Sequence, residues 1–546
     1  MSFLLPINSN TLALYFCFQR TKPLYLQRFL LCLALASMFL ATPAAPQDHA
    51  PHGSQTDNPS AADAGPEAGA AAAGLGILGL LPANSVTEHV LKTAAGDLPY
   101  TATAGTLVLY GQDGKPMAKM FYTAYAARDR TPGRPITFAF NGGPGAASAY
   151  LHLGLVGPRI LEFGPHGEGG TNPVLTDNPD SWLAFTDLVL IDPVGTGWSR
   201  ASNDKVAADF YGIGEDADSI AKAIALYVAQ NDRMAAPKFI LGESYGGFRA
   251  AKVATRLKDS QGILVSGIVM LSPLIEGNLL FGDRRYPLWA ALQLPSLAAG
   301  ELERKNAFDP AAVAEAEKFA MTDYLVALSG PEPSGDAAKN LYARIAQMTG
   351  IPEALVTRAR GFLTDVYVKN SKSASSEVVS RYDASLAAPD PYPESDSEEG
   401  GDPVLDGFTR AYGAAFASYA RNELGFETEL TYNLLANNVN EKWKWSQNEN
   451  GGGRTRASAA GDIRELLSVI PSFRLLVAHG YSDALTPYGI NKYVIDHLPA
   501  TLSAGRVELK LYRGGHMFYT RTGSRQALSA DARAFYSSSL EKVQGE

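Results

Sequence analysis

Cysteine is almost absent from this chain, which has only two among its 546 residues. Both, Cys17 and Cys32, lie within the first 46 residues. Removal of that segment would leave no cysteine, so no disulfide framework could form in the rest of the chain. We therefore expect the protein to depend on its packed core alone. Its hydrophobic content of 46% is ample for such a core.

The N-terminal segment lacks a hydrophobic run long enough to span a bilayer comfortably. Its mostly apolar run, Phe29–Ala41, has instead the length of a signal-peptide core. Basic residues precede this run and small residues follow it: Arg20, Lys22, Arg28 and Thr42–Ala45. We expect residues 1–45 to be a signal peptide that exports the protein to the periplasm or the outside, with no stable membrane association after cleavage. A membrane anchor, or a start codon downstream of Met1, is the alternative.

The chain also lacks an excess of basic residues. A net charge of −9 and a pI near 5.5 argue against a nucleic-acid partner. No motif indicates a cofactor or a metal. His49 and His52 fall in residues 46–83, an Ala-, Gly- and Pro-rich stretch with few large apolar groups, which we interpret as a flexible linker.

Residues 84–275 and 466–546 have the pattern of one core with alternating strands and helices. Short, mostly apolar runs at 136–140, 187–191 and 239–241 are typical of buried strands, and residues 215–230 have the spacing of an amphipathic helix. This alternation predicts an α/β class with a mostly parallel, doubly wound sheet. Between residues 276 and 465 helical stretches dominate. We interpret that block as a helical cap insertion with a mobile, charge-rich loop at 369–406.

The stretch Gly242-Glu243-Ser244-Tyr245-Gly246 lies between an apolar run and a helical pattern. In that context a G-x-S-x-G pattern predicts a nucleophile elbow, a strained turn that exposes a serine at the carboxyl edge of a sheet. The alternative, a serine in an ordinary Gly-rich turn, would hold for the bare five-residue pattern. We therefore consider Ser244 the candidate nucleophile.

A serine hydroxyl needs a base to remove its proton during attack, and histidine has a suitable pKa. Among the eight histidines, His516 follows an apolar strand pattern through Gly514-Gly515, which places it at a strand's carboxyl end. Asp483 follows another strand pattern and precedes His516 by 33 residues. The order Ser244, Asp483, His516 is the one expected for a catalytic triad on this fold. A turn-forming aspartate is the alternative for Asp483.

An oxyanion hole needs two backbone N–H donors. One is expected from Tyr245, the residue after the nucleophile. The other is expected from the glycine loop at 141–145, with Gly143 as the candidate donor. A tight turn without a ligand is the alternative for that loop.

With these residues placed, the chain resembles the serine carboxypeptidase family, which includes cathepsin A-like enzymes. The resemblance is carried by FNGGPG (140–145), NPDSW (178–182), DPVGTGWS (192–199), GESYGG (242–247), ARNELGF (420–426), GYSD (480–483) and GGHM (514–517). It implies an α/β-hydrolase fold with a cap, no metal or other cofactor, and peptide substrates with a free C-terminus. It also implies that Asn141, Gly142 and Glu243 bind the terminal carboxylate. Two facing carboxyl groups must share a proton, so an acidic pH optimum is expected.

The sequence departs from the family pattern at several positions. Ala139 and Ala146 stand where the family usually has Trp and Cys. Leu155 stands where well-studied members carry a second glutamate that pairs with the elbow glutamate. GHMFY also replaces the more usual proline-containing sequence after the histidine. None of these changes touches the expected triad.

The leading hypothesis is a serine-type carboxypeptidase that works through an acyl-enzyme intermediate. An esterase or acyltransferase with the same triad is the first alternative. A catalytically inactive exported binding protein is the second. The family often forms dimers, so the resemblance also implies a homodimer as a candidate assembly.

Overall fold

The computed structural model describes residues 76–128, 131, 133–164, 168–446 and 453–544. The expected signal peptide, residues 1–45, lies outside the described residues, as does the larger part of the expected linker, 46–83. The final residues of that linker are described: Gly76–Leu80 form a 3-10 helix, η1, in which Leu78 is buried. Within the described ranges, no helix combines the length and the apolar character that a membrane crossing needs.

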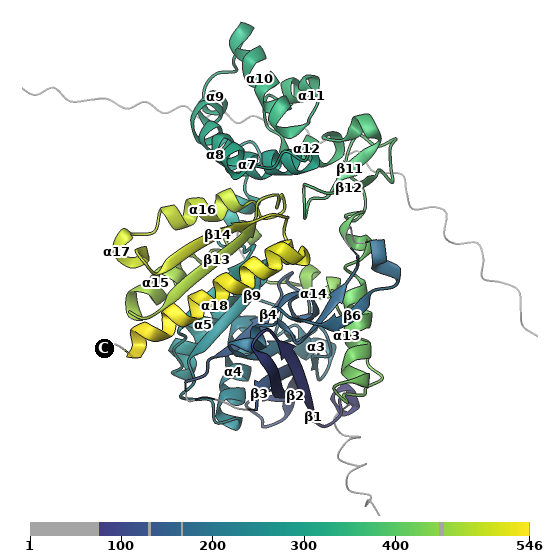
Figure 1. Ribbon diagram of the computed structural model, residues 1–546, viewed down its shortest axis with the longest axis vertical. Helices are drawn as coiled ribbons and strands as arrows, with labels where there is room; N and C mark the ends of the chain where they lie inside the picture. The colour runs from purple at the N-terminus through teal and green to yellow at the C-terminus, as the bar shows by residue number, and fades with distance from the viewer. Residues whose placement is uncertain (1–75, 129–130, 132, 165–167, 447–452, 545–546) are drawn as a thin grey trace, which may run out of the picture. The chain divides into compact units, whose positions relative to one another are not determined.

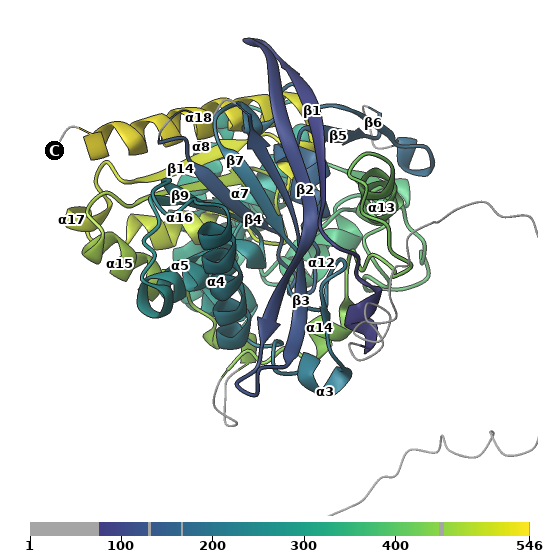
Figure 2. The same cartoon turned by 90° about the horizontal axis from the view of Figure 1, so that it is seen from below.

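A mixed sheet of ten strands forms the centre of the described chain (Figures 1 and 2). Its spatial order is β1 (Ser85–Thr93), β2 (Gly96–Tyr110), β3 (Pro116–Ala127), β7 (Asp187–Ile191), β4 (Ile136–Phe140), β9 (Lys238–Glu243), β10 (Gly267–Leu271), β13 (Arg474–Gly480) and β14 (Val507–Tyr512), with β8 (Arg200–Ala201) beside β3. The six strands from β7 to β14 are parallel, and β1–β3 are antiparallel to their neighbours. The predicted mostly parallel, doubly wound sheet is confirmed, and its order is that of an α/β-hydrolase fold.

Helices cover both faces of this sheet because successive strand residues point to opposite sides. In β4, Phe138 and Phe140 pack into one core cluster, whereas Ala139 packs into the other. The first cluster is closed by α4 (Ile213–Gln230), α5 (Tyr245–Gln261), α15 (Ala460–Val469) and α16 (Tyr488–Asp496). The second is closed by η2 (a π-helical turn, His152–Val156), α13 (Ala411–Asn422) and α18 (Thr522–Gln544). The sheet is therefore buried on both faces along its parallel part.

A group of helices at one end of the sheet has an apolar cluster of its own (Figure 1). It contains α7 (Pro287–Arg304), α8 (Pro310–Phe319), η5 (Ala320–Tyr324), α9 (Leu325–Ser329), α10 (Gly335–Thr349), α11 (Glu353–Arg358) and α12 (Thr364–Asn370). Helices α13 and α15, which also fall within the predicted insertion 276–465, pack on the sheet instead. Their apolar side chains belong to the two core clusters.

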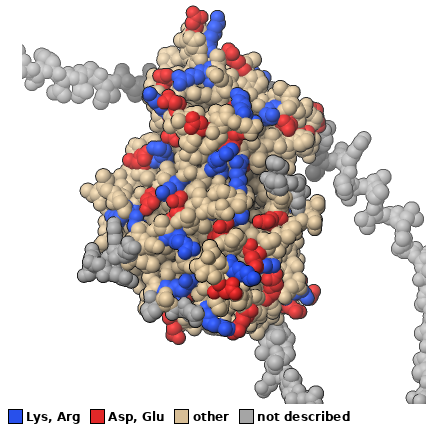
Figure 3. Space-filling model, in the orientation of Figure 1, with Lys and Arg blue, Asp and Glu red and all other residues tan. Residues whose placement is uncertain are grey.

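The charge-rich passage 369–406, predicted as a loop, contains a two-stranded sheet of β11 (Glu377–Val379) and β12 (Ala387–Pro389). A second small sheet pairs β5 (Arg159–Glu162) with β6 (Val174–Asp177). Further short elements are α2 (Ala149–Leu151), η3 (Glu168–Thr171), η4 (Trp182–Ala184), α3 (Asp204–Ala207), α6 (Gly277–Phe281), η6 (Ser373–Ser375), η7 (Leu405–Gly407), α14 (Asn437–Glu441), η8 (Gly453–Arg456), α17 (Ala500–Ser503) and η9 (Phe518–Thr520). On the face drawn in Figure 3, acidic and basic side chains are interspersed rather than segregated by sign.

The turn between β9 and α5 requires glycine on both sides of Ser244. A Cβ atom on Gly242 would lie 1.9 Å from the carbonyl oxygen of Gly246. A Cβ atom on Gly246 would lie 2.6 Å from the carbonyl oxygen of Phe140. Ser244 itself has φ of 60° and ψ of −125°, a backbone conformation that costs of order 1–3 kcal/mol and that the surrounding contacts must maintain.

Gly246→Ala should therefore lower the free energy of unfolding by about 2–3 kcal/mol, because its new methyl group meets backbone atoms that cannot move aside cheaply. Gly461→Ala in α15 is the matched control, since no atom lies within 4 Å of its added Cβ. We expect it to be neutral or to stabilise by up to about 1 kcal/mol. Urea unfolding followed by circular dichroism measures both variants. Equal midpoints would contradict the packing at the turn.

Candidate active site

A cavity of about 420 Å³ lies at the carboxyl ends of the parallel strands. It is lined by seven of the eight site residues expected from the sequence: Asn141, Gly142, Gly143, Glu243, Ser244, Tyr245 and His516. The eighth, Asp483, is completely buried directly behind His516. The structure thus brings together residues that span 375 positions of the chain, and every expected site residue lies at or next to this cavity.

Ser244 is positioned by backbone bonds from the neighbouring strand and loop. Its N–H donates to the carbonyl of Leu271 at the end of β10 (2.9 Å), and its carbonyl accepts from Leu274 (3.1 Å). Since Ser244 also precedes the first residue of α5, it lies at the positive end of that helix dipole. The candidate nucleophile is therefore held from both sides of the turn.

His516 and Asp483 form a buried pair. The Nδ1 atom of His516 lies 2.9 Å from Oδ2 of Asp483. Burial by itself lowers the pKa of His516, but the charge and hydrogen bond of Asp483, together with the charge of Glu243, outweigh burial and raise it above its usual value. A carboxylate on Nδ1 leaves the Nε2 atom as the proton acceptor, which is the tautomer that a general base needs.

Thr486, which sequence reasoning missed, contacts both Asp483 and His516. Its hydroxyl donates to Oδ2 of Asp483 (2.7 Å), and its backbone N–H donates to Oδ1 (2.8 Å). The same hydroxyl lies 3.0 Å from Nδ1 of His516. An aspartate followed three residues later by a threonine, just before Pro487, is a turn signal that could have indicated this residue.

The expected oxyanion donors lie on two segments in backbone contact. Among the described residues, no group accepts a hydrogen bond from the N–H of Gly143 or of Tyr245, and both residues line the cavity. A Cβ on Gly142 would lie 2.5 Å from the Tyr245 nitrogen, so the glycine loop and the start of α5 touch directly. Two free donors in such a rigid arrangement can stabilise an oxyanion.

Arg249, a second residue that sequence reasoning missed, contacts both the glycine loop and the start of α5. Its side chain is almost fully buried and donates to the backbone carbonyl of Asn141 and to Asp216. Its guanidinium also lies 4.9 Å from the ring centre of Tyr245, a distance for a cation–π contact. One side chain thus contacts both segments that carry the expected oxyanion donors, at Asn141 and at Tyr245.

Glu243 is a buried carboxyl group at the cavity wall. Its Oε2 atom accepts hydrogen bonds from the Asn141 side chain and from the hydroxyl of Tyr519 (2.8 Å). Burial raises the pKa of Glu243 to about 7, although the charge of His516 and these two hydrogen bonds act in the opposite direction. Glu243 can therefore carry a proton near neutral pH and donate it to an anion.

Leu155 lies in the π-helical turn His152–Val156 and is fully buried in the apolar cluster of the second sheet face. No carboxyl group is supplied to Glu243 from this position. Tyr519 supplies a hydroxyl instead, from η9 just after His516. The two sequence departures thus affect the surroundings of the same residue, Glu243: Leu155 removes a carboxyl partner, and the tyrosine of GHMFY adds a hydroxyl partner.

Segments within the insertion supply much of the remaining cavity wall. Its polar residues include Asp402, Asp406, Thr409 and Arg410, with Arg410 paired to Asp406 at 3.1 Å. Its apolar residues come from the insertion (Leu280, Phe281, Leu435 and Trp445) and from the loops after β10 and β13 (Leu274 and Leu485). In the part of the chain that the structure describes, His, Cys, Asp and Glu side chains form no group of three that could hold a metal.

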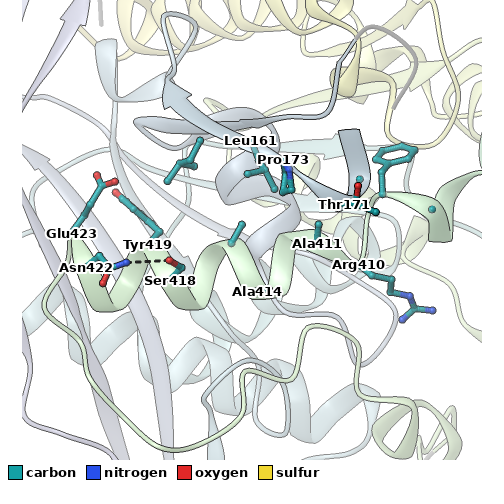
Figure 4. Close-up of a pocket in the computed structure, with 15 residues that line it drawn as sticks. Leu161, Thr171, Pro173, Arg410, Ala411, Ala414, Ser418, Tyr419, Asn422 and Glu423 are labelled. Carbon is teal, nitrogen blue, oxygen red and sulfur yellow. Dashed lines mark hydrogen bonds between the residues drawn. The ribbon is translucent and has the colours of Figure 1, made fainter. Parts of the chain in front are cut away.

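A larger hollow of about 510 Å³ lies between α13 and the β5–β6 sheet (Figure 4). Its walls include Ala411, Ala414 and Pro173, and the only bond drawn there joins Asn422 to Ser418 (3.1 Å). It contains none of the expected site residues. We therefore assign the chemistry to the smaller cavity, because that one holds the buried acid–base groups.

Comparison with known proteins covers the part of this site that lies in the first half of the chain. Residues 103–280 match the family model described as serine carboxypeptidase. This match spans 178 of the 546 residues. The resemblance inferred from the motifs is confirmed, and the matched segment includes the glycine loop and the elbow.

Curated serine carboxypeptidases match over similar lengths. The chain is 25% identical over 174 residues to the pheromone-processing carboxypeptidase KEX1 of Yarrowia lipolytica, covering 31% of this chain and 26% of that protein. It is 27% identical over 170 residues to serine carboxypeptidase-like 35 of Arabidopsis thaliana, covering 30% and 33%. The matches thus span about a quarter to a third of these relatives.

A solved proline iminopeptidase of Mycobacterium smegmatis covers 81% of this chain and 99% of its own, with 15% identity and a TM-score of 0.36. The assignment of the fold rests on the sheet order described above.

We predict that Thr486→Val lowers kcat for a simple ester about tenfold. The change keeps the side-chain shape but removes the donor to Asp483, so His516 is oriented less firmly. Thr486→Ser keeps the hydroxyl and should retain most of the activity. Steady-state kinetics of both variants test this, with circular dichroism as the check of folding. Equal rates for the two variants would show that the hydroxyl has no part in orienting the base.

Proposed function

We propose that this protein is a serine carboxypeptidase that removes residues from the free C-termini of peptides. The observation that carries the proposal is the arrangement of one cavity: Ser244 and His516 lie beside a buried carboxyl group, Glu243, that is poised to hold a proton. The His516–Asp483 pair supports acyl transfer, and the Glu243–Asn141 pair supports recognition of a carboxylate.

In the proposed reaction the Ser244 oxygen attacks the carbonyl carbon of the last peptide bond while His516 takes the hydroxyl proton. The backbone N–H groups of Gly143 and Tyr245 donate to the oxyanion. His516 then gives its proton to the leaving amine, the C–N bond breaks, and an acyl-enzyme remains. Water attacks this ester with His516 again as base, which releases the shortened peptide and restores Ser244.

The substrate's terminal carboxylate would lie against Glu243, the Asn141 side chain and Gly142. Two ionised carboxyl groups at contact distance repel each other, so Glu243 must be protonated to bind it. The free carboxyl end would thereby place the last peptide bond, and no other, over Ser244. This gives an exopeptidase rather than an endopeptidase.

The apolar side chains of the cavity wall favour an esterase as the second candidate, since Leu280, Phe281 and Trp445 can hold an acyl chain without a carboxylate. The two candidates share the triad and differ in their need for Glu243. Turnover of simple esters without release of amino acids from blocked dipeptides would favour the esterase.

Digestion of peptides followed by mass spectrometry tests the leading proposal. The wild type should release single residues from the C-terminus, and Ser244→Ala should lose this activity by a factor of about 10⁴ or more because the nucleophile is absent. Ser334→Ala, an exposed serine at the start of α10, is the matched control and should match the wild type. Internal cleavage, or undiminished activity of Ser244→Ala, would contradict the proposal.

The pH dependence should differ between peptides and esters. Below about pH 7 Glu243 is protonated and can donate to a carboxylate; above it the ionised group repels the substrate. We therefore expect kcat/KM for peptides with a free C-terminus to fall as the pH rises past 7, up to tenfold per unit.

An ester without a carboxylate should lack this alkaline limb. Both substrates should lose activity at low pH, where His516 is protonated. The acidic optimum expected from the sequence stays a prediction, since the raised pKa of His516 sets how far the acid limb extends. A peptide profile that stays level from pH 5 to pH 8 would count against carboxylate binding by Glu243.

A further inference from the structure

Tyr519 is a buried residue whose only polar side-chain atom contacts the Glu243 carboxyl group at the cavity wall. Its hydroxyl lies 2.8 Å from Oε2 of Glu243, and none of the residue is exposed. The ring fits there because position 154 is glycine: a Cβ on Gly154 would lie 2.9 Å from Cε2 of Tyr519. The neighbouring Phe518 stacks on Tyr512 with ring centres 5.0 Å apart, which fixes the 3-10 turn that carries Tyr519.

Both donors to Glu243 use the same carboxyl oxygen. Asn141 and Tyr519 donate to Oε2, whereas no described group bonds Oε1 and Glu243 lines the cavity. An oxygen that accepts two hydrogen bonds is a poor place for a proton, because the proton would face two other donors. The proton of neutral Glu243 therefore belongs on Oε1, where it can be donated into the cavity.

We propose that Tyr519 is a positioning residue that holds the proton of Glu243 on the oxygen facing the substrate. Leu155, which stands at the position of the second family glutamate, provides no carboxyl group for this role. The Tyr519 hydroxyl fills this role by donating a hydrogen bond, and it does not share its own proton with the groups that bind substrate. This inference rests on the proposed function, because it assumes that Glu243 binds the terminal carboxylate of a peptide.

Among the described residues around Glu243, Tyr519 is the one whose hydroxyl donates a hydrogen bond to it. His516 and Asp483 act on it from the loops after β14 and β13, and Asn141 from the loop after β4. Tyr150 on α2 and Tyr412 on α13 are close enough to sense its charge, but no hydrogen bond joins either of these described residues to it. Burial raises the pKa of Tyr519 well above its usual value, so the hydroxyl keeps its proton throughout the working pH range.

Tyr519→Phe removes this donor and keeps the ring. Because the hydrogen bond favours the ionised form of Glu243, its loss should move the alkaline limb of kcat/KM for a blocked dipeptide upward by about one pH unit. KM at pH 5 should rise at least threefold, since the proton is no longer confined to Oε1. Turnover of a simple ester should change less than twofold, because the triad is untouched.

Tyr412→Phe is the matched control, since it removes another buried hydroxyl near Glu243 that makes no bond to it. Its pH profile should coincide with that of the wild type. An unmoved limb and unchanged KM in Tyr519→Phe, with the wild type active on peptides, would overturn the inference while leaving the proposed function intact. A wild type inactive on peptides would overturn both.

A second variant keeps the test decisive if Tyr519→Phe does not fold. Replacement of Tyr519 by 3-fluorotyrosine preserves the shape and makes the hydroxyl a stronger donor. It should move the alkaline limb in the opposite direction, to lower pH. A profile identical to that of the wild type would overturn the inference on its own.

Discussion

The contact between two backbone segments is the constraint on which the rest of the site depends. Positions 142 and 246 must both be glycine, because a Cβ on either would lie within about 2.6 Å of backbone atoms across the contact. The loop after β4 and the first turn of α5 therefore form one rigid unit. Since each segment carries one of the two proposed oxyanion donors, the distance between Gly143 and Tyr245 is set by the fold itself. Preorganisation of this kind costs nothing at the moment of reaction.

Asp483 and His516 lie on two loops that are both hydrogen-bonded to the insertion. The carbonyl of Tyr382 accepts from the N–H of His516, and the N–H of Ala384 donates to the carbonyl of Ser482 (2.8 Å). Asp383 bonds the Ser482 hydroxyl as well (2.6 Å). The passage 369–406 thus fastens the loops after β13 and β14 to each other, so the insertion contributes to catalytic geometry as well as to the cavity wall.

Local pattern was enough to place Ser244, Asp483 and His516, because each follows a strand and their order along the chain is characteristic. Arg249 and Tyr519 could not be found that way. Arg249 acts on a residue 108 positions away, and Tyr519 on one 276 positions away. Neither carries a local signal, since an arginine or a tyrosine beside a motif is ordinary. The contacts of the passage 369–406 could not be predicted either. They are made largely by backbone hydrogen bonds, and the composition of the passage resembles that of a loop.

The positions of Glu243 and His516 connect substrate binding to the state of the base. Each charge acts on the other group: ionised Glu243 raises the pKa of His516, and protonated His516 lowers that of Glu243. One shared proton can therefore give either a neutral pair or an ion pair. A carboxylate placed against Glu243, as we propose, favours the neutral pair, because it repels the ionised form. Binding a free C-terminus would then leave His516 unprotonated, which is the form that activates Ser244.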